Sequence, residues 1–129
     1  MELPGVGQFI EALQTAVAKR PKRVCLLASA DLAHIGLRFG DAEAPSRFTL
    51  KSMNEEDRRL LGYAERVDAE GFYDSIHRER DRRRICGFPP IYTLLKLVDA
   101  REGKLLKYDQ SMDPPTQSVV TFASLAFFS

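Results

Sequence analysis

The stretch that most constrains the fold is residues 23–29, RVCLLAS, a nearly continuous apolar run. A strand covered by helices on both faces has this pattern, whereas a strand with one solvent-facing side alternates apolar and polar residues. Apolar residues at helical spacing precede the run over residues 7–19, and Pro21 ends that helix. A helix leading directly into a buried strand predicts a layered α/β sheet, α/β/α, with this strand at its centre.

The remaining pattern predicts three more helices and two more strands. A capping box at residues 52–55 should start one helix, and Asp68 should cap a shorter one. Pro89 and Pro90 suit the start of a fourth helix, which Gly103 would end. Residues 30–51 are expected to form a loop, and the strands are expected at residues 104–108 and 118–128.

Three strands make a thin sheet, and no strand pattern precedes the first helix. The predicted sheet is therefore incomplete in this chain. Either further strands come from elsewhere, or the chain associates through an exposed sheet edge. We expect a homo-oligomer or a complementing chain as partner.

Composition restricts the class of protein. The chain has 129 residues, enough for a single domain over residues 1–129, and a formal charge of +1 from 19 basic and 18 acidic side chains. This balance predicts binding neither to nucleic acid nor to a membrane surface. The N-terminus lacks the pattern of a signal peptide, and the longest apolar stretch is too short to span a bilayer, so we expect a cytoplasmic protein.

Asp31 and His34 follow the predicted central strand directly. Functional groups in open α/β sheets gather beyond the carboxyl ends of strands. Three positions apart on a helical turn, the two side chains would share one side, where a carboxylate can fix the imidazole tautomer for a general base or a metal site. The alternative is structural: Asp31 caps a turn and His34 is a hydrogen-bonded core residue. The spacing alone favours this structural alternative.

Cys86 is the second candidate, since it lies between an arginine-rich run and Gly87 at a predicted helix start. Such surroundings favour the thiolate, the form that attacks carbon or binds a soft metal. The alternative is that Cys86 only fills space. Cys25, within the apolar run, is expected to be a small buried residue, and the two cysteines do not indicate a disulfide framework.

The arginine run at residues 78–84 holds five arginines with two interleaved acids. A solvated helix end with local ion pairs is the favoured interpretation, ahead of a phosphate-binding clamp. His77 is expected on a polar surface without a functional role.

Taken in order, these motifs resemble the Memo family, also called AmmeMemoRadiSam system protein B. Residues 29–36, SADLAHIG, with RFG at 38–40, are similar to its S-x-D-L-x-H-x-G and R-F motifs. Residues 85–95 resemble its I-C-G-x-x-P-I-x-x-L-L motif. Residues 106–111 and 118–123 resemble its closing segments. The match covers nearly the whole chain and corresponds to the C-terminal half of the family fold.

The resemblance implies a fold like that of class III extradiol dioxygenases, with a metal-type pocket built from two N-terminal histidines and a C-terminal cysteine. Cys86 matches that metal-binding cysteine, and Asp31 and His34 match an acid and a histidine lining the pocket. In the dioxygenase relatives the matching histidine acts as acid or base beside non-haem iron, so His34 and Asp31 are the candidate catalytic residues. The two N-terminal histidines have no counterpart in this chain.

The leading hypothesis is a Memo-family protein with a partial dioxygenase-like metal or redox site, its substrate unassigned. Iron or copper is the expected cofactor by ligand softness, which would make the protein a non-haem iron or copper dependent oxidoreductase. The family name also implies a pathway link to radical-SAM and AMMECR-type proteins. The alternative is a non-enzymatic binding module that holds a peptide or a small ligand in the same pocket.

Overall fold

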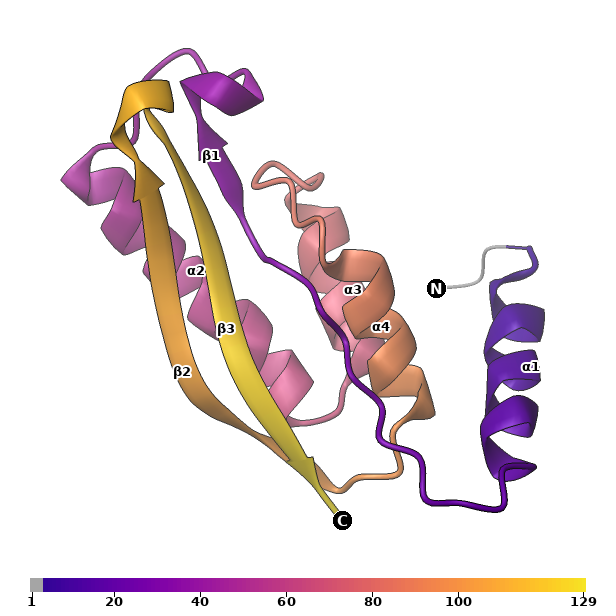
Figure 1. The fold of residues 1–129 in the computed structure, drawn as a ribbon. Helices are drawn as coiled ribbons and strands as arrows, with labels where there is room; N and C mark the ends of the chain where they lie inside the picture. The colour runs from indigo at the N-terminus through magenta and orange to yellow at the C-terminus, as the bar shows by residue number, and fades with distance from the viewer. Residues whose placement is uncertain (1–3) are drawn as a thin grey trace.

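A computed structural model describes residues 4–129 of the chain. Helix α1 (Val6–Ala18) leads into an extended segment, residues 22–33, which ends in the short strand β1 (His34–Gly36). Helices α2 (Arg47–Glu65), α3 (Ala69–Arg78) and α4 (Phe88–Leu97) follow. A hairpin of β2 (Glu102–Asp113) and β3 (Ser118–Phe128) closes the chain (Figure 1).

The sheet is antiparallel, with strand order β1-β3-β2. The β2–β3 register runs from Glu102 opposite Phe128 to Asp113 opposite Ser118, with one bulge between Leu105 and Lys107. β1 adds only three residue pairs, from His34 opposite Val120 to Gly36 opposite Ser118. The long hairpin is therefore the framework of the sheet, and β1 is a short third strand at its upper end.

One face of the sheet packs on the helices, and the other carries exposed apolar side chains. Leu105, Tyr108 and Leu125 pack against a core formed mainly by α2, α3 and α4. Phe122 and Phe128 lie exposed on β3. The structure confirms the α/β class, and within residues 4–129 helices cover the sheet from one side. The core side chains are Leu32, Ala33, Met53, Leu60, Leu61, Ala64, Ala69, Phe72, Ile76, Ile85, Tyr92, Leu95 and Val119.

The prediction of a central strand at residues 23–29 was wrong for the described chain. These residues are extended, but they belong to no strand and make no backbone hydrogen bond within residues 4–129. Cys25 is exposed and not buried. The apolar run has the side-chain pattern of a central strand, but a strand also needs neighbours for its N–H and C=O groups, and the described residues supply none.

Three element boundaries also differ from the predictions. α2 begins at Arg47 because the Ser46 side chain accepts a hydrogen bond from the Thr49 N–H at 3.1 Å, so the capping box at residues 52–55 lies inside the helix. β1 falls within the expected loop at 30–51. α4 ends at Leu97, well before Gly103, which lies in β2. The helix count and the final strand agree with the predictions.

Candidate functional site

Asp31 and His34 lie where the extended segment joins the sheet. The Leu32 N–H donates to the Thr121 carbonyl at 2.8 Å, and the Thr121 N–H donates to the Ala33 carbonyl at 3.0 Å. These bonds, together with the burial of Leu32 and Ala33, anchor the chain between the two candidates. Asp31 and His34 therefore flank the anchored residues 32 and 33. Both lie on extended backbone, and not on the helical turn that their spacing in the sequence suggested.

Cys86 lies on the loop before α4, immediately ahead of Gly87, the N-cap of that helix. A Cβ atom at Gly87 would lie 2.2 Å from the Asp31 carbonyl oxygen and 2.9 Å from the Ala30 Cβ. The absence of a side chain at Gly87 thus lets the loop approach residues 30–31 closely. The Cys86 thiol donates a long hydrogen bond to the Asp31 carbonyl at 3.9 Å.

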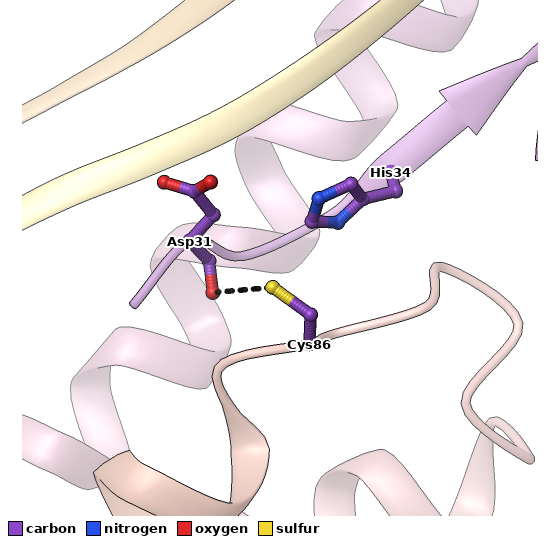
Figure 2. A group of neighbouring side chains, drawn as sticks. All are labelled: Asp31, His34 and Cys86. Atoms are coloured by element: carbon purple, nitrogen blue, oxygen red, sulfur yellow. Dashed lines mark hydrogen bonds between the residues drawn. The ribbon is translucent and has the colours of Figure 1, made fainter. Parts of the chain in front are cut away.

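The structure brings Asp31, His34 and Cys86 together. One carboxylate oxygen, one imidazole nitrogen and the thiol sulfur all lie within 4.8 Å of one another. Figure 2 shows the sulfur directed toward the stretch of chain that carries the other two residues. Asp31 and Cys86 are exposed and His34 is half-buried, so the cluster is open to solvent on one side.

The protein fixes the orientation of the His34 ring. Its Nδ1 lies 3.1 Å from both the Leu32 and the Arg84 carbonyl oxygens, and the Phe39 ring packs edge-on at 5.2 Å between centroids. Carbonyl oxygens only accept hydrogen bonds, so Nδ1 must carry the proton in these contacts. In the neutral ring Nε2 then keeps its lone pair, which is the arrangement of most metal-binding histidines.

Asp41 and Arg84 support this arrangement, and neither was predicted from the sequence. Arg84 donates to the Asp41 carboxylate at 2.8 Å and to the His34 carbonyl at 3.2 Å. Asp41 also accepts from the Gly36 N–H at 2.8 Å. The hydrogen bond from Arg84 lowers the pKa of Asp41, although partial burial opposes that shift. The two residues are 43 positions apart, so no local motif could have revealed the pair.

The arginine run is not the purely solvated helix end that was predicted. Arg82 is exposed, as expected, but it pairs at 2.9 Å with Glu56, which lies 26 positions earlier in the chain. Arg83 is only 2% exposed and forms ion pairs with Asp57 and Glu79. Arg83 and Arg84, the arginines next to Cys86, both form ion pairs with carboxylates elsewhere in the chain. These two arginines therefore connect parts of the fold and do not pair with the Cys86 sulfur.

Comparisons with known proteins show the family of the chain. The family model described as Memo-like protein matches residues 5–126. The chain belongs to the Memo-like family. A MEMO1 family protein of Thermus thermophilus is 35% identical over 117 residues, which are 89% of this chain and 34% of the relative. One from Aquifex aeolicus is 26% identical over 117 residues, which are 88% of this chain and 30% of the relative.

The chain spans about a third of the length of the curated Memo-like relatives it matches. The motifs seen in the sequence, including both site segments, fall within the matched residues 5–126. Within residues 4–129, no helix is both long enough and apolar enough to cross a membrane. Because the matched region is only a third of each relative, any activity of those longer proteins can only be proposed for this chain.

Proposed function

We propose that this Memo-like chain binds a transition-metal ion through Asp31, His34 and Cys86 as part of a redox-type site. The convergence of the three donor atoms within 4.8 Å carries the proposal. Ligand atoms around a tetrahedral metal lie about 3.5 Å apart, given metal–ligand distances of about 2.0–2.3 Å. Small side-chain rotations at this open site would bring the donor atoms from within 4.8 Å of one another to the spacing of about 3.5 Å that a tetrahedral metal requires.

The chemistry of the donors supports the choice of metal. A thiolate with one imidazole and one carboxylate is softer than the all-oxygen sets that hold magnesium or calcium, and it suits iron or copper. Either metal, when bound, would supply one-electron redox chemistry and an open position for a small ligand. The chain itself would supply the Cys86 sulfur as a ligand, orient His34 through Nδ1, and leave the site accessible from solvent.

Asp31 and His34 have an alternative role in the proposal, as the acid–base pair of the site, when they do not bind the metal themselves. His34 carries its proton on Nδ1, fixed by two carbonyls, so Nε2 is the atom free to bind a metal or accept a proton. The Asp31 carboxylate is exposed beside it.

The test is metal stoichiometry with matched controls from the same chain. The purified protein is incubated anaerobically with Fe(II) or Cu(I), passed through a desalting column and assayed for metal. We expect about one ion per chain, lost in Cys86→Ser and His34→Gln. Cys25→Ser and His77→Gln change an exposed cysteine and a surface histidine outside the cluster, and they should bind as the parent does. Absence of bound metal, or equal loss in the control variants, would rule the proposal out.

A further inference from the structure

One buried carboxylate lies where helix α2, the sheet and the loop at residues 79–87 meet. Asp57, on α2, is fully buried and forms an ion pair with Arg83 of that loop. Asp57 also accepts a hydrogen bond from the Tyr108 hydroxyl on β2 at 2.7 Å. The buried Thr121 side chain on β3 is a further hydrogen-bond partner of the carboxylate. A single side chain thus joins three parts of the fold.

The Arg83 contact leads from Asp57 to the backbone of the candidate site. The Arg83 carbonyl accepts the His34 N–H at 2.8 Å, and the next carbonyl of the loop, that of Arg84, lies 3.1 Å from His34 Nδ1. The same loop carries Cys86. The ion pair with Asp57 therefore anchors the loop that supplies both the thiol and a carbonyl that orients the imidazole.

Thr121 connects Asp57 to the other segment of the site, residues 31–34. An ionised carboxylate only accepts hydrogen bonds, so the Thr121 hydroxyl donates its one proton to Asp57. The hydroxyl oxygen then accepts the Ala33 N–H at 2.9 Å. This segment carries the two remaining candidate residues, so the contact through Thr121 anchors their backbone.

The chemistry of Asp57 suits orientation better than it suits stability. A buried ion pair loses the hydration of both charges, and apolar residues of similar volume often stabilise a core equally well. A buried carboxylate adds direction, because each of its hydrogen bonds fixes the position of a partner. The arginine partner lies 26 positions along the chain, and the threonine lies on the last strand. Through them, one side chain holds two site segments that are about 50 positions apart.

We propose that Asp57 is a positioning residue that holds the two site segments in place, so that His34 and Cys86 face the same point. The carboxylate acts on the loop through the Arg83 side chain and on the other segment through the Thr121 hydroxyl. Asp57 is not a member of the cluster of donor atoms. Its importance for metal binding rests on the proposed function, whereas the orientation of His34 can be measured in the metal-free chain.

The tautomer of the His34 ring reports this orientation. Nδ1 carries the proton because two carbonyl oxygens lie 3.1 Å from it. Hydrogen bonding of this kind should favour the Nδ1–H form over the Nε2–H form by about tenfold. Nitrogen NMR of the neutral imidazole distinguishes the two forms. The chain has two histidines, and His77→Gln identifies the signals of the other one.

Two variants of the network test the proposal. Asp57→Asn keeps the shape of the side chain but removes the charge that holds Arg83. We expect the excess of the Nδ1–H form to fall below about threefold, because the loop carbonyl is no longer held against the ring. Thr121→Val removes the other contact without removing a charge, and it should lower the ratio as well.

Tyr92→Phe is the matched control. It removes a hydrogen bond from a buried hydroxyl to a carboxylate, that of Glu70, which is not part of the Asp57 network. The tautomer ratio should therefore stay near tenfold in Tyr92→Phe. An equal fall in this control would show a general loosening of the fold and would overturn the proposal.

The amide spectrum shows first whether each variant is folded, and Thr121→Val decides alone if Asp57→Asn does not fold. A ratio that stays near tenfold in the folded network variants would also overturn the proposal. Where the parent chain binds Fe(II) or Cu(I), affinity for the metal should fall together with the ratio. A parent chain that binds neither metal would contradict the proposed function but would leave the tautomer result valid.

Discussion

Arg83 shows what residue-level patterns miss. A run of arginines indicates a solvated surface, yet this guanidinium is buried and is held by Asp57, Glu79 and Glu56. Asp57 is itself fully buried, accepts from the Tyr108 hydroxyl at 2.7 Å, and has its pKa raised by burial. The partner carboxylate lies 26 positions away. Burial of one arginine in the run thus depends on a long-range contact that no local spacing encodes.

Removing one member of this buried ion pair should be costly. In Arg83→Met, Asp57 loses its counter-charge in a buried site, and we expect a loss of about 3–5 kcal/mol in the free energy of unfolding. Arg82→Met is the matched control, since Arg82 is 60% exposed and its ion pair lies at the surface, which contributes at most about 1 kcal/mol. Urea denaturation at neutral pH measures both values. Similar losses in the two variants would contradict the structural role of Arg83.

Some residues of the candidate site could be predicted from sequence motifs, and others could not. Asp31, His34 and Cys86 could be named from the sequence because each lies in a short motif, and the structure brings the three together. Their roles in binding and catalysis stay predictions. The hydrogen bonds that orient His34 come from backbone carbonyls and from Arg84 with Asp41. A short sequence motif contains no information on backbone geometry or on contacts between residues tens of positions apart, so these hydrogen bonds could not be predicted.

At the scale of elements, the approach of α4 to the extended segment determines the position of Cys86. This approach depends on Gly87, where any side chain would collide with the backbone of Asp31. Gly87→Ala should therefore force the loop away from residues 30–31 and destabilise the protein by about 1–3 kcal/mol. Thermal or urea unfolding measures this loss, and metal binding should weaken with it.

Gly7→Ala is the control for this variant, because the added methyl group at Gly7, in helix α1, meets no atom within 4 Å. Alanine is the better helix former, so this change should leave stability equal or raise it by up to about 1 kcal/mol. If Gly87→Ala were as stable as Gly7→Ala, the close approach seen at Cys86 would not exist in solution.

A hydrogen bond between α3 and α4 makes stability depend on alkaline pH. The buried Tyr92 hydroxyl donates to the Glu70 carboxylate at 2.6 Å. Burial, reinforced by that carboxylate, raises the pKa of Tyr92 to about 12 from its usual 10.0. The folded state therefore binds this proton more tightly than the unfolded state. The resulting stability is present below pH 10 and is lost as the pH rises from 10 to 12.

Tyr92→Phe should remove this component of the alkaline loss. We expect the free energy of unfolding to fall less steeply between pH 10 and 12 in Tyr92→Phe than in the parent protein. Urea titrations at pH 8, 10 and 12 measure both slopes. An unchanged slope in Tyr92→Phe would show that the phenol ionises equally readily in both states.

For the whole molecule, the class of fold could be predicted from the sequence, but the pairing of its strands could not. Residues 118–128 combine β-branched and aromatic residues, and they form β3 as expected. Residues 23–29 have the apolar pattern of a central strand, yet they remain unpaired in the described structure. Side-chain patterns report which surfaces must be buried, whereas strand formation also requires neighbouring backbone, and here that neighbour is not among residues 4–129.

Unpaired backbone has a direct consequence for the dynamics of the chain alone. An amide exchanges with solvent only when its hydrogen bond opens, and amides without a protein partner exchange near their intrinsic rate. Residues 23–30 have no such partner within the described chain, whereas the β2–β3 hairpin is paired along its length. Opening the hairpin requires a large part of the unfolding free energy, typically several kcal/mol for a small domain. The hydrogen-bonded hairpin amides should therefore exchange about a thousandfold more slowly than those of residues 24–30. Exchange at neutral pH, resolved by mass spectrometry of peptides, measures this ratio, and equal protection of the two regions would mean that the segment is paired in solution.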